Sequence, residues 1–308
     1  MTPSNALFDQ PWWLDAVAPG AWEQVEVAGG DGSSVARLPF VRRTRFGLTV
    51  VSQPSLTQAL GPALAATEGK YARRLELEKE RMEALISALP PFAFFRQNFA
   101  PAITNWLPFY WAGFTATARY TYRLEDLADL DAVWAEFTDS TRRQVRRAER
   151  VVEVRDDFAL DRFLELNEMT FRRQGLPVPH GLGLIRRIDE AAGGRDARRL
   201  LAAIDAQGRT HAAIYLVFDE RAAYYLIGAR DDELRSSGAT SLLLWEAIRF
   251  AAGRSRVFDF EGSMIESIER FFRGFGAKQV PYFRVEKARG LARPVLAARE
   301  LAGREPPR

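Results

Sequence analysis

The order of helical and extended patterns along this chain predicts a mixed α/β fold. From residue 152 onward the sequence reads as a strand, two helices, three strands, a helix, a strand, a helix and a final strand. Short hairpin-type connections, AQGR and DER, join the three consecutive strands, which are therefore expected to be antiparallel. Helices before and after them would cover both faces of one mixed sheet.

The elements follow from residue spacing. Runs rich in valine, isoleucine and aromatic residues, bounded by glycine and other turn residues, predict strands. Apolar residues at helical spacing predict helices, and Pro90-Pro91 would end the first long one. The predicted strands are 22–27, 35–41, 48–52, 92–99, 119–126, 152–155, 199–205, 210–218, 222–229, 256–262 and 280–285, and the predicted helices are 71–89, 127–150, 158–174, 184–192, 240–252 and 266–273.

Composition excludes several classes of function. The 308 residues contain 43 Lys and Arg against 40 Asp and Glu, so the net charge is only +3, less than a dedicated nucleic-acid coat would carry. Cysteine is absent, which excludes disulfides and a cysteine nucleophile, and two histidines make a multi-histidine metal site improbable. No metal, no membrane insertion and a cytoplasmic location are expected, since no apolar run approaches about 18 residues.

The join between the strand ending near residue 229 and the following helix consists of small residues. Small side chains at a helix N-terminus expose backbone N–H groups, which favour a bound phosphate. An ordinary Ser or Thr helix cap explains the same residues. The candidate cofactor-binding residues here are Arg235, Ser236, Ser237, Gly238, Ala239 and Thr240.

The predicted helix 127–150 ends in the basic run TRRQVRRAER. Its arginines fall at i, i+1, i+4, i+5 and i+8, which predicts a single cationic stripe. Such a stripe is either a solvated helix face or a clamp for the phosphates of a nucleotide, a coenzyme or RNA. Arg142, Arg143 and Arg146 are the candidate substrate-binding residues of this helix.

The element order, with a Gly-containing join before a helix, resembles the GNAT N-acyltransferase superfamily. Its coenzyme A motif is [QR]-x-x-G-x-[GA]; the residues from Arg235 match it at Arg and the first Gly but carry Thr240 at the last position. The stretch FDFEGSMIESIERFFRGFGAKQVPYFRV, 258–285, is similar to Fem-like acyltransferases, which include peptidoglycan-bridge aminoacyltransferases. TRRQVRRAER and FLELNEMTFRRQG are similar to the start of their second domain.

This resemblance implies two tandem GNAT-like domains that share a mixed sheet architecture. Residues 1–126, joined by 287–308, would form a degenerate domain on the acceptor side, and residues 127–286 the acyltransferase domain, beginning with the basic helix 127–150. Acyl-CoA is the implied co-substrate, with aminoacyl-tRNA as the alternative. Phe272 stands where many bridge-forming members carry a Lys linked to the use of aminoacyl-tRNA, and the neighbouring Arg273 is the candidate substitute for that cation.

Amide formation from an activated ester requires a base for the amine, donors for the oxyanion and an acid for the leaving group. Asp259 and Glu261 lie at i and i+2 of a predicted strand and would share one face, so either could serve as the base. The alternative is that they pair with arginines or cap the next helix. Gly228 and Ala229 are expected to bind the donor near the oxyanion, and Tyr225 is the candidate acid, although a strand tyrosine more often serves in packing.

The aromatic run WLPFYWAGF, 106–114, is expected either to pack in a core or to line an acceptor site with Tyr110 and Trp111. Three functions remain open: an N-acyltransferase that uses acyl-CoA and a primary amine of a small or cell-envelope-type acceptor, an aminoacyl-tRNA-dependent amide former, and a GNAT-fold module that binds a ligand or RNA without turnover. A small-molecule amine is the expected partner, and tRNA is the alternative one. Oligomeric state is not predicted.

Overall fold

A computed structural model of the chain describes residues 6–173, 175, 179–262 and 264–290. The described residues divide into two compact units, 6–119 with 281–290 and 120–280. The division falls inside strands β6 (Thr115–Leu124) and β12 (Lys278–Ala288). Most of the segment 287–308, which the sequence assigned to the first domain, lies outside the described residues.

The first unit is an antiparallel meander that continues through one parallel pair. Its strands run in the order β1-β2-β3-β5-β12, with β3 and β5 parallel and the other neighbours antiparallel; β4 pairs with β2. Helix α2 packs on β1, β2 and α3. The elements are η1 (Leu7–Asp9), α1 (Pro11–Val17), β1 (Trp22–Ala28), β2 (Ser34–Arg45), β3 (Leu48–Ser52), β4 (Ala63–Leu64), α2 (Tyr71–Ala88), β5 (Phe94–Asn98) and α3 (Leu107–Trp111).

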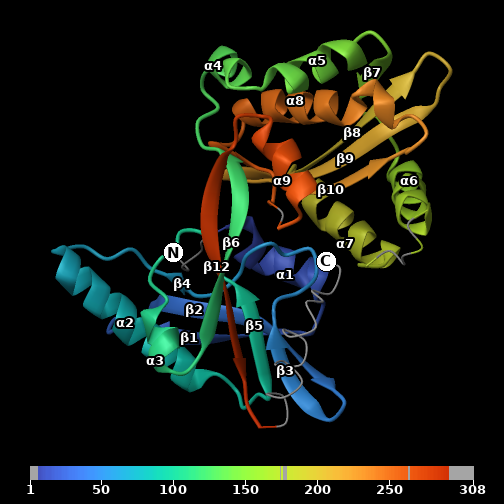
Figure 1. Cartoon of the computed structure of the whole chain (residues 1–308). Coiled ribbons are helices and arrows are strands. Elements are labelled where there is room, and N and C mark those ends of the chain that lie inside the picture. The colour runs from blue at the N-terminus through green and yellow to red at the C-terminus, as the bar shows by residue number, and fades with distance from the viewer. Residues whose placement is uncertain (1–5, 174, 176–178, 263, 291–308) are drawn as a thin grey trace. The chain divides into compact units, whose positions relative to one another are not determined.

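The second unit has a mixed sheet in the order β6-β11-β10-β9-β8-β7, in which β10 and β11 are parallel. Figure 1 shows α5 stacked on α8 over one face of this sheet and α6 and α7 on the other. The elements are α4 (Leu130–Ala135), α5 (Asp139–Ala148), β7 (Val152–Arg155), α6 (Leu160–Arg173), α7 (Leu182–Gly193), β8 (Arg198–Asp205), β9 (Thr210–Phe218), β10 (Ala222–Arg230), η2 (Arg235–Ser237), α8 (Ala239–Ala252), β11 (Val257–Asp259) and α9 (Glu266–Arg273). The predicted mixed α/β class is confirmed.

The two units share one plan. In the first, the antiparallel strands β1-β2-β3 lead through a connection that contains α2 to the parallel strand β5, which is flanked by antiparallel β12. In the second, the antiparallel strands β8-β9-β10 lead through α8 to the parallel strand β11, flanked by antiparallel β6. The chain therefore carries the same sheet architecture twice, as the weak sequence pattern of the first half suggested.

The predicted long helix at 127–150 is wrong as a single element. It is broken into α4 and α5, because Thr138 adopts an extended conformation and its side chain accepts the Thr141 N–H as an N-cap. Helix α4 has its own cap, Asp129, which accepts the N–H groups of Asp131 and Ala132. The apolar periodicity of the sequence continues from α4 into α5, so it gave no sign of either N-cap.

The core of the second unit is built around aromatic rings from separate segments. Phe137, which is 2% exposed, contacts the rings of Trp134, Trp245 and Phe275 at centroid distances of 5.1, 5.3 and 5.1 Å. Because these rings come from α4, α8 and the FFRGFG turn, Phe137 joins three elements that surround the parallel pair β10/β11.

In the described helices, no segment combines the length and the hydropathy that a membrane crossing would require.

The FFRGFG turn supports the same junction through its glycines. The Gly274 carbonyl accepts the Thr138 N–H at 2.9 Å, so the turn anchors the start of α5. Gly276 has φ of 69°, and a Cβ there would lie 2.6 Å from Glu136 Cβ, so only glycine permits this approach. The motif that the sequence singled out for its cation therefore has a packing function here.

We predict that Phe137→Ala destabilises the protein by about 3–5 kcal/mol, because it removes a ring that three elements share and leaves a cavity. Chemical denaturation followed by near-UV circular dichroism measures this loss. The matched control, Arg143→Ala on the exposed side of α5, should change stability by less than about 0.5 kcal/mol. Equal effects of the two substitutions would contradict the assignment of Phe137 to the core.

Candidate functional site

The parallel strands β10 and β11 separate after a short shared ladder. They pair only at Ala222↔Val257, Ala223↔Phe258 and Tyr224↔Asp259, and β11 ends there. Strand β10 continues to Arg230 with β9 on its other side. From Tyr225 to Arg230 no strand of the described chain pairs with the β11 side of β10, so its alternate backbone N–H and C=O groups face an opening.

A β-bulge at the start of this opening sets the position of Tyr225. The register between β10 and β9 shifts between Tyr225 and Ile227, which leaves Leu226 as the extra residue. A Cβ built on Gly228 would lie 1.9 Å from the Tyr225 hydroxyl oxygen. The bulge and the missing side chain of Gly228 together allow the phenol to lie across the strand at the point where the strands separate.

The Tyr225 hydroxyl makes no recorded hydrogen bond within the described residues. Burial raises the pKa of this phenol to about 12, and the charge of Arg230 partly opposes that increase. Its ring packs edge-on against Phe272 with centroids 6.1 Å apart. Phe272 is 5% exposed and also contacts Phe260, so it bridges the two separating strands. Position 272, which in the resemblance above corresponds to a Lys of many bridge-forming members, is therefore apolar in this chain and packs against Tyr225.

Asp259 is fully buried and its carboxylate is engaged by several donors. Arg123 Nε lies 2.7 Å from Oδ2, and Oδ1 accepts the Thr121 hydroxyl and, at 2.8 Å, the Glu261 backbone N–H. Burial alone would lower the pKa of Arg123, but the charge of Asp259 and the hydrogen bond to it raise that pKa overall. The geometry therefore agrees with the alternative expectation that Asp259 pairs with an arginine, which here is Arg123 of β6.

Glu261 does not lie on the strand face that the alternating pattern predicted. Because β11 ends at Asp259, Glu261 belongs to the following turn and has φ of 59°, a strained value for a residue with a Cβ. Gly262 follows at φ of 56°, and a Cβ there would lie 2.2 Å from the Tyr120 carbonyl oxygen. The turn is thus pressed against the β6 backbone and holds Glu261 in a fixed conformation at the end of β11.

The small-residue join forms a 3-10 turn, η2, and then the N-terminus of α8. The Ser237 side chain accepts the Ala239 N–H at 3.3 Å, so part of this terminus is capped by serine, as the simpler interpretation expected. Gly238 has φ of 84°, and its Cα side is covered by α5, since a Cβ would lie 2.5 Å from the Gln144 carbonyl oxygen. No hydrogen bond is recorded for the Gly238 and Thr240 N–H groups within the described chain. Arg235 and Ser236 are exposed.

The arginines of α5 do not form one stripe. Arg142 donates to the Ala135 carbonyl at 2.8 Å and pairs with Asp139, and Arg146 lies 5.9 Å from the centroid of the Trp134 ring. These two are engaged by their own unit. Arg143 and Arg147 of α5, and Arg150 just after the helix, are exposed and have no recorded ion pair in the described part of the chain.

The remaining predicted residues lie elsewhere. Arg273 is exposed on α9 and pairs with Glu269 at 2.9 Å. In the first unit, Tyr110 and Trp111 are each 58% exposed on α3, so they are not core residues. Trp111, with Trp106 and Tyr71, lines a groove of about 840 Å³ between α2 and α3.

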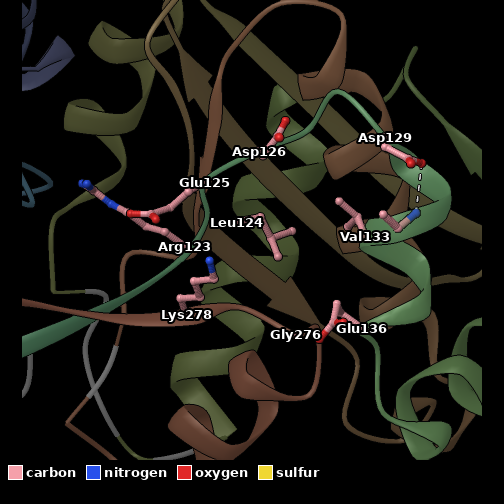
Figure 2. A pocket seen from close by; sticks show the side chains of 10 residues that line it. Arg123, Leu124, Glu125, Asp126, Asp129, Val133, Glu136, Gly276 and Lys278 are labelled. Atoms are coloured by element: carbon pink, nitrogen blue, oxygen red, sulfur yellow. Dashed lines mark hydrogen bonds between the residues drawn. The ribbon is translucent and has the colours of Figure 1, made fainter.

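Figure 2 shows a second pocket, of about 210 Å³, between the end of β6, α4 and the start of β12. Leu124 and Val133 form its apolar wall, and Lys278 extends toward its centre. Arg123 contributes only its stem, because its guanidinium points away from the pocket. Among the described residues, no group of three or more acidic or histidine side chains could hold a metal ion.

The corresponding opening in the first unit is closed by the chain itself. Beyond the last β3–β5 pair, Ser52↔Arg96, the Asn98 N–H donates to the Gln53 side chain at 2.6 Å and the Asn98 carbonyl accepts the Leu60 N–H at 2.7 Å. The Ala100 N–H then donates to the Leu60 carbonyl at 3.2 Å. Residues 53–60 therefore occupy the edge that the second unit leaves open.

The second unit combines a separating parallel pair, a bulge beside the opening and a helix that starts after a small-residue turn. Residues 135–273 match the family model described as an acetyltransferase (GNAT) domain. The resemblance expected from the sequence is confirmed. No curated protein sequence shows a match to the chain.

Solved structures extend the likeness to both units. A structure of FemX aligns with a TM-score of 0.67 at 13% identity, covering 92% of each chain. L-PGS from Bacillus licheniformis aligns at 0.54 and 13% identity over 92% of this chain and 90% of that one. A tandem GNAT protein from the clavulanic acid biosynthesis pathway aligns at 0.54 and 13% identity over 94% and 91%. The chain therefore has the tandem, Fem-like GNAT fold.

We predict that Arg123→Ala destabilises the protein by about 3–5 kcal/mol, because it leaves the Asp259 charge buried without its cation. Thermal and chemical denaturation measure the loss. The double variant Arg123→Ala with Asp259→Asn removes the unpaired charge and should recover part of the stability that the single variant loses. Strictly additive losses would show that the two side chains do not interact.

Proposed function

We propose that the chain is an N-acyltransferase that moves an acyl group from acyl-CoA to a primary amine of a small or cell-envelope-type acceptor and forms an amide. One observation carries the proposal: the Tyr225 hydroxyl lies beside the open edge of β10 without a recorded hydrogen-bond partner in the described chain. An uncommitted acid next to unpaired backbone amides is what thioester aminolysis requires.

The donor thioester carbonyl would lie along the open edge of β10. Because successive N–H groups of a strand point to opposite sides, one of the two N–H groups of Gly228 and Ala229 faces the opening, and it would donate to the carbonyl oxygen as its negative charge develops. The amine nitrogen forms the new C–N bond, and the C–S bond breaks as the intermediate collapses. The sulfur leaves as a thiol after it takes a proton from Tyr225, and the proton lost by the amine goes to the base.

Tyr225 is suited to the acid's role because burial keeps it protonated. With a pKa of about 12, the phenol retains its proton throughout the range in which amines become nucleophilic. Its position over Gly228 places the hydroxyl at the strand that would hold the donor.

Glu261 is assigned as the base and Asp259 as the residue that positions it. The Asp259 carboxylate accepts the Glu261 N–H, and Arg123 and Thr121 hold that carboxylate in place. Since these donors already engage Asp259 in a fully buried setting, proton acceptance from a substrate would require breaking the pair. Glu261 follows at the end of β11, where the two strands have separated.

The diphosphate of the donor is assigned to the start of α8. The Gly238 and Thr240 N–H groups and the exposed Arg235 and Ser236 side chains offer donors there, and the positive end of a 14-residue helix favours an anion. Arg143 lies on the α5 surface next to Gln144, which contacts Gly238, so it is assigned to the adjacent phosphate. Arg142 and Arg146 receive no such role because their own unit engages them.

A second candidate, an aminoacyl-tRNA-dependent amide former, is favoured by the exposed side of α5. Arg143, Arg147 and Arg150 present three cations that suit a phosphate backbone, and their effect would be strongly salt-dependent. Phe272 argues for the CoA donor, because the position linked to tRNA use is buried and apolar and faces Tyr225. Arg273 does not replace that cation, since it pairs with Glu269 on the helix surface.

The choice of donor can be measured directly. Incubation with acetyl-CoA and, separately, with charged tRNA, across a panel of primary amines, should deplete only acetyl-CoA and yield an acetylated amine detected by mass spectrometry. Depletion of charged tRNA alone would replace the proposal with the second candidate. Saturable CoA binding without turnover of either donor would identify a binding module.

We predict that Tyr225→Phe lowers kcat by about 100-fold and changes the KM for acyl-CoA little, because the lost proton donor acts only in the transition state. Gly228→Ala should also lower kcat, since a Cβ there would lie 1.9 Å from the Tyr225 hydroxyl oxygen and the phenol would have to shift. Wild-type kcat should not fall between about pH 8 and pH 10, because the acid's pKa is about 12.

The matched control is Tyr215→Phe, whose hydroxyl donates to Asp189 instead. It should reduce stability and leave kcat within about threefold. Full activity of Tyr225→Phe would remove Tyr225 from the mechanism while leaving the choice of donor unaffected.

A further inference from the structure

The β2–β3 hairpin of the first unit ends in a turn that carries a residue unfavourable for folding. Arg45 and Leu48 form its last pair, so Phe46 and Gly47 are the turn residues, with φ of 52° and 74°. Two successive left-handed residues make the hairpin turn that favours Asn-Gly or Gly-Gly. A phenylalanine at the first position is strained, and its side chain is 92% exposed, so no packing offsets the strain.

The surroundings of this tip are cationic. The sequence contains no acidic residue from 32 to 67. Arg42 pairs with Glu23 at 2.9 Å, but Arg43 and Arg45 are exposed and have no recorded ion pair with any described residue. These two share one face of the hairpin with Leu48 and Val50, which lie opposite them in the ladder and are half-buried. Arg45 lies 5.6 Å from the centroid of the Phe46 ring.

We propose that this hairpin tip is a peripheral docking element for an anionic lipid bilayer. Phe46 at the apex would enter the boundary between headgroups and acyl chains, with Leu48 beside it, while Arg43 and Arg45 bind lipid phosphates. A lipid surface fits better than RNA, because the aliphatic side chains of Leu48 and Val50 lie opposite the two arginines, and aliphatic carbon offers a base neither a stacking face nor a hydrogen bond. The contact is surface binding by one ring, and it is independent of the acyl-transfer site.

The placement explains why strain is tolerated. A turn that only had to close the hairpin would gain stability from Asn at position 46, which adopts the left-handed conformation readily. Phe46 is bulky and apolar, has an unfavourable backbone conformation and is exposed at the end of the ribbon. Its ring is therefore placed to make the first contact with a binding surface. Figure 1 shows the β2–β3 ribbon with this turn at its free end.

The test is sedimentation of the full-length protein with vesicles. The wild type should partition onto vesicles of equal parts phosphatidylcholine and phosphatidylglycerol, and not onto phosphatidylcholine alone. Phe46→Asn should lower the partition coefficient by about tenfold, since the ring no longer leaves water, and should raise the melting temperature because the turn relaxes. Phe46→Leu should keep most of the binding. Arg43→Gln with Arg45→Gln should reduce it, and added salt should weaken the wild type more than this variant.

Each contrary result overturns the proposal. Absence of wild-type binding to the anionic vesicles would do so, as would unchanged partition of Phe46→Asn. A lower melting temperature for Phe46→Asn would show that the ring supports the fold. Loss of binding to a short single-stranded RNA in Phe46→Asn, with vesicle binding unchanged, would assign the tip to RNA. Acyl transfer to a dissolved amine should be the same in wild type and Phe46→Asn, which separates this test from that of the enzymatic proposal.

Discussion

The arrangement of the second unit depends on one buried negative charge, the carboxylate of Asp259. A carboxylate excluded from water is tolerated only when donors surround it, and here β6 supplies Arg123 and Thr121 while the chain's own next turn supplies the Glu261 N–H. This set of bonds ends β11 after a short ladder and directs the turn onto the β6 backbone at Gly262. The opening between β10 and β11 is therefore a consequence of how the charge is satisfied.

The two units share one sheet plan and differ in whether the strand edge beside the parallel pair is open. In the first, Gln53 and Leu60 satisfy the backbone of Asn98 beyond the parallel pair, so the chain fills its own gap and leaves no row of unpaired amides. In the second, β10 keeps an open edge, and the Tyr225 phenol lies across it over Gly228. An unpaired backbone edge is costly in a folded chain, so we place the proposed donor site in the second unit, whose β10 edge is open.

The fold class and most strands and helices could be predicted from local sequence. Buried positions alternate along strands and recur every three or four residues along helices, and the spacing of apolar residues follows the same periods. The small-residue composition of the join, and not its periodicity, pointed to Gly238, and Tyr225 was considered because it lies on the preceding predicted strand. The break at Thr138 was not predicted, since its cap lies inside a continuous apolar pattern. The roles of Asp259 and Glu261 depend on Arg123, which is distant in sequence. Only the alternation of Thr121 and Arg123 in RYTYRLED could have indicated a polar face.

Glu261 and Phe46 are two of the four described non-glycine residues with a positive φ. Glu261 and Phe46 both have a side chain and a left-handed backbone, in turns where glycine or asparagine would relieve the strain. Their surroundings differ: contacts from Asp259 and from the Gly262–β6 approach hold the Glu261 turn in place, whereas Phe46 is exposed and nothing compensates for its conformation. A strained backbone that neighbouring contacts hold in place can position a reactive side chain. A strained backbone at an exposed turn can place a side chain in solvent, where it can contact a partner. We therefore propose that the same backbone conformation serves a base at the first position and a surface contact at the second.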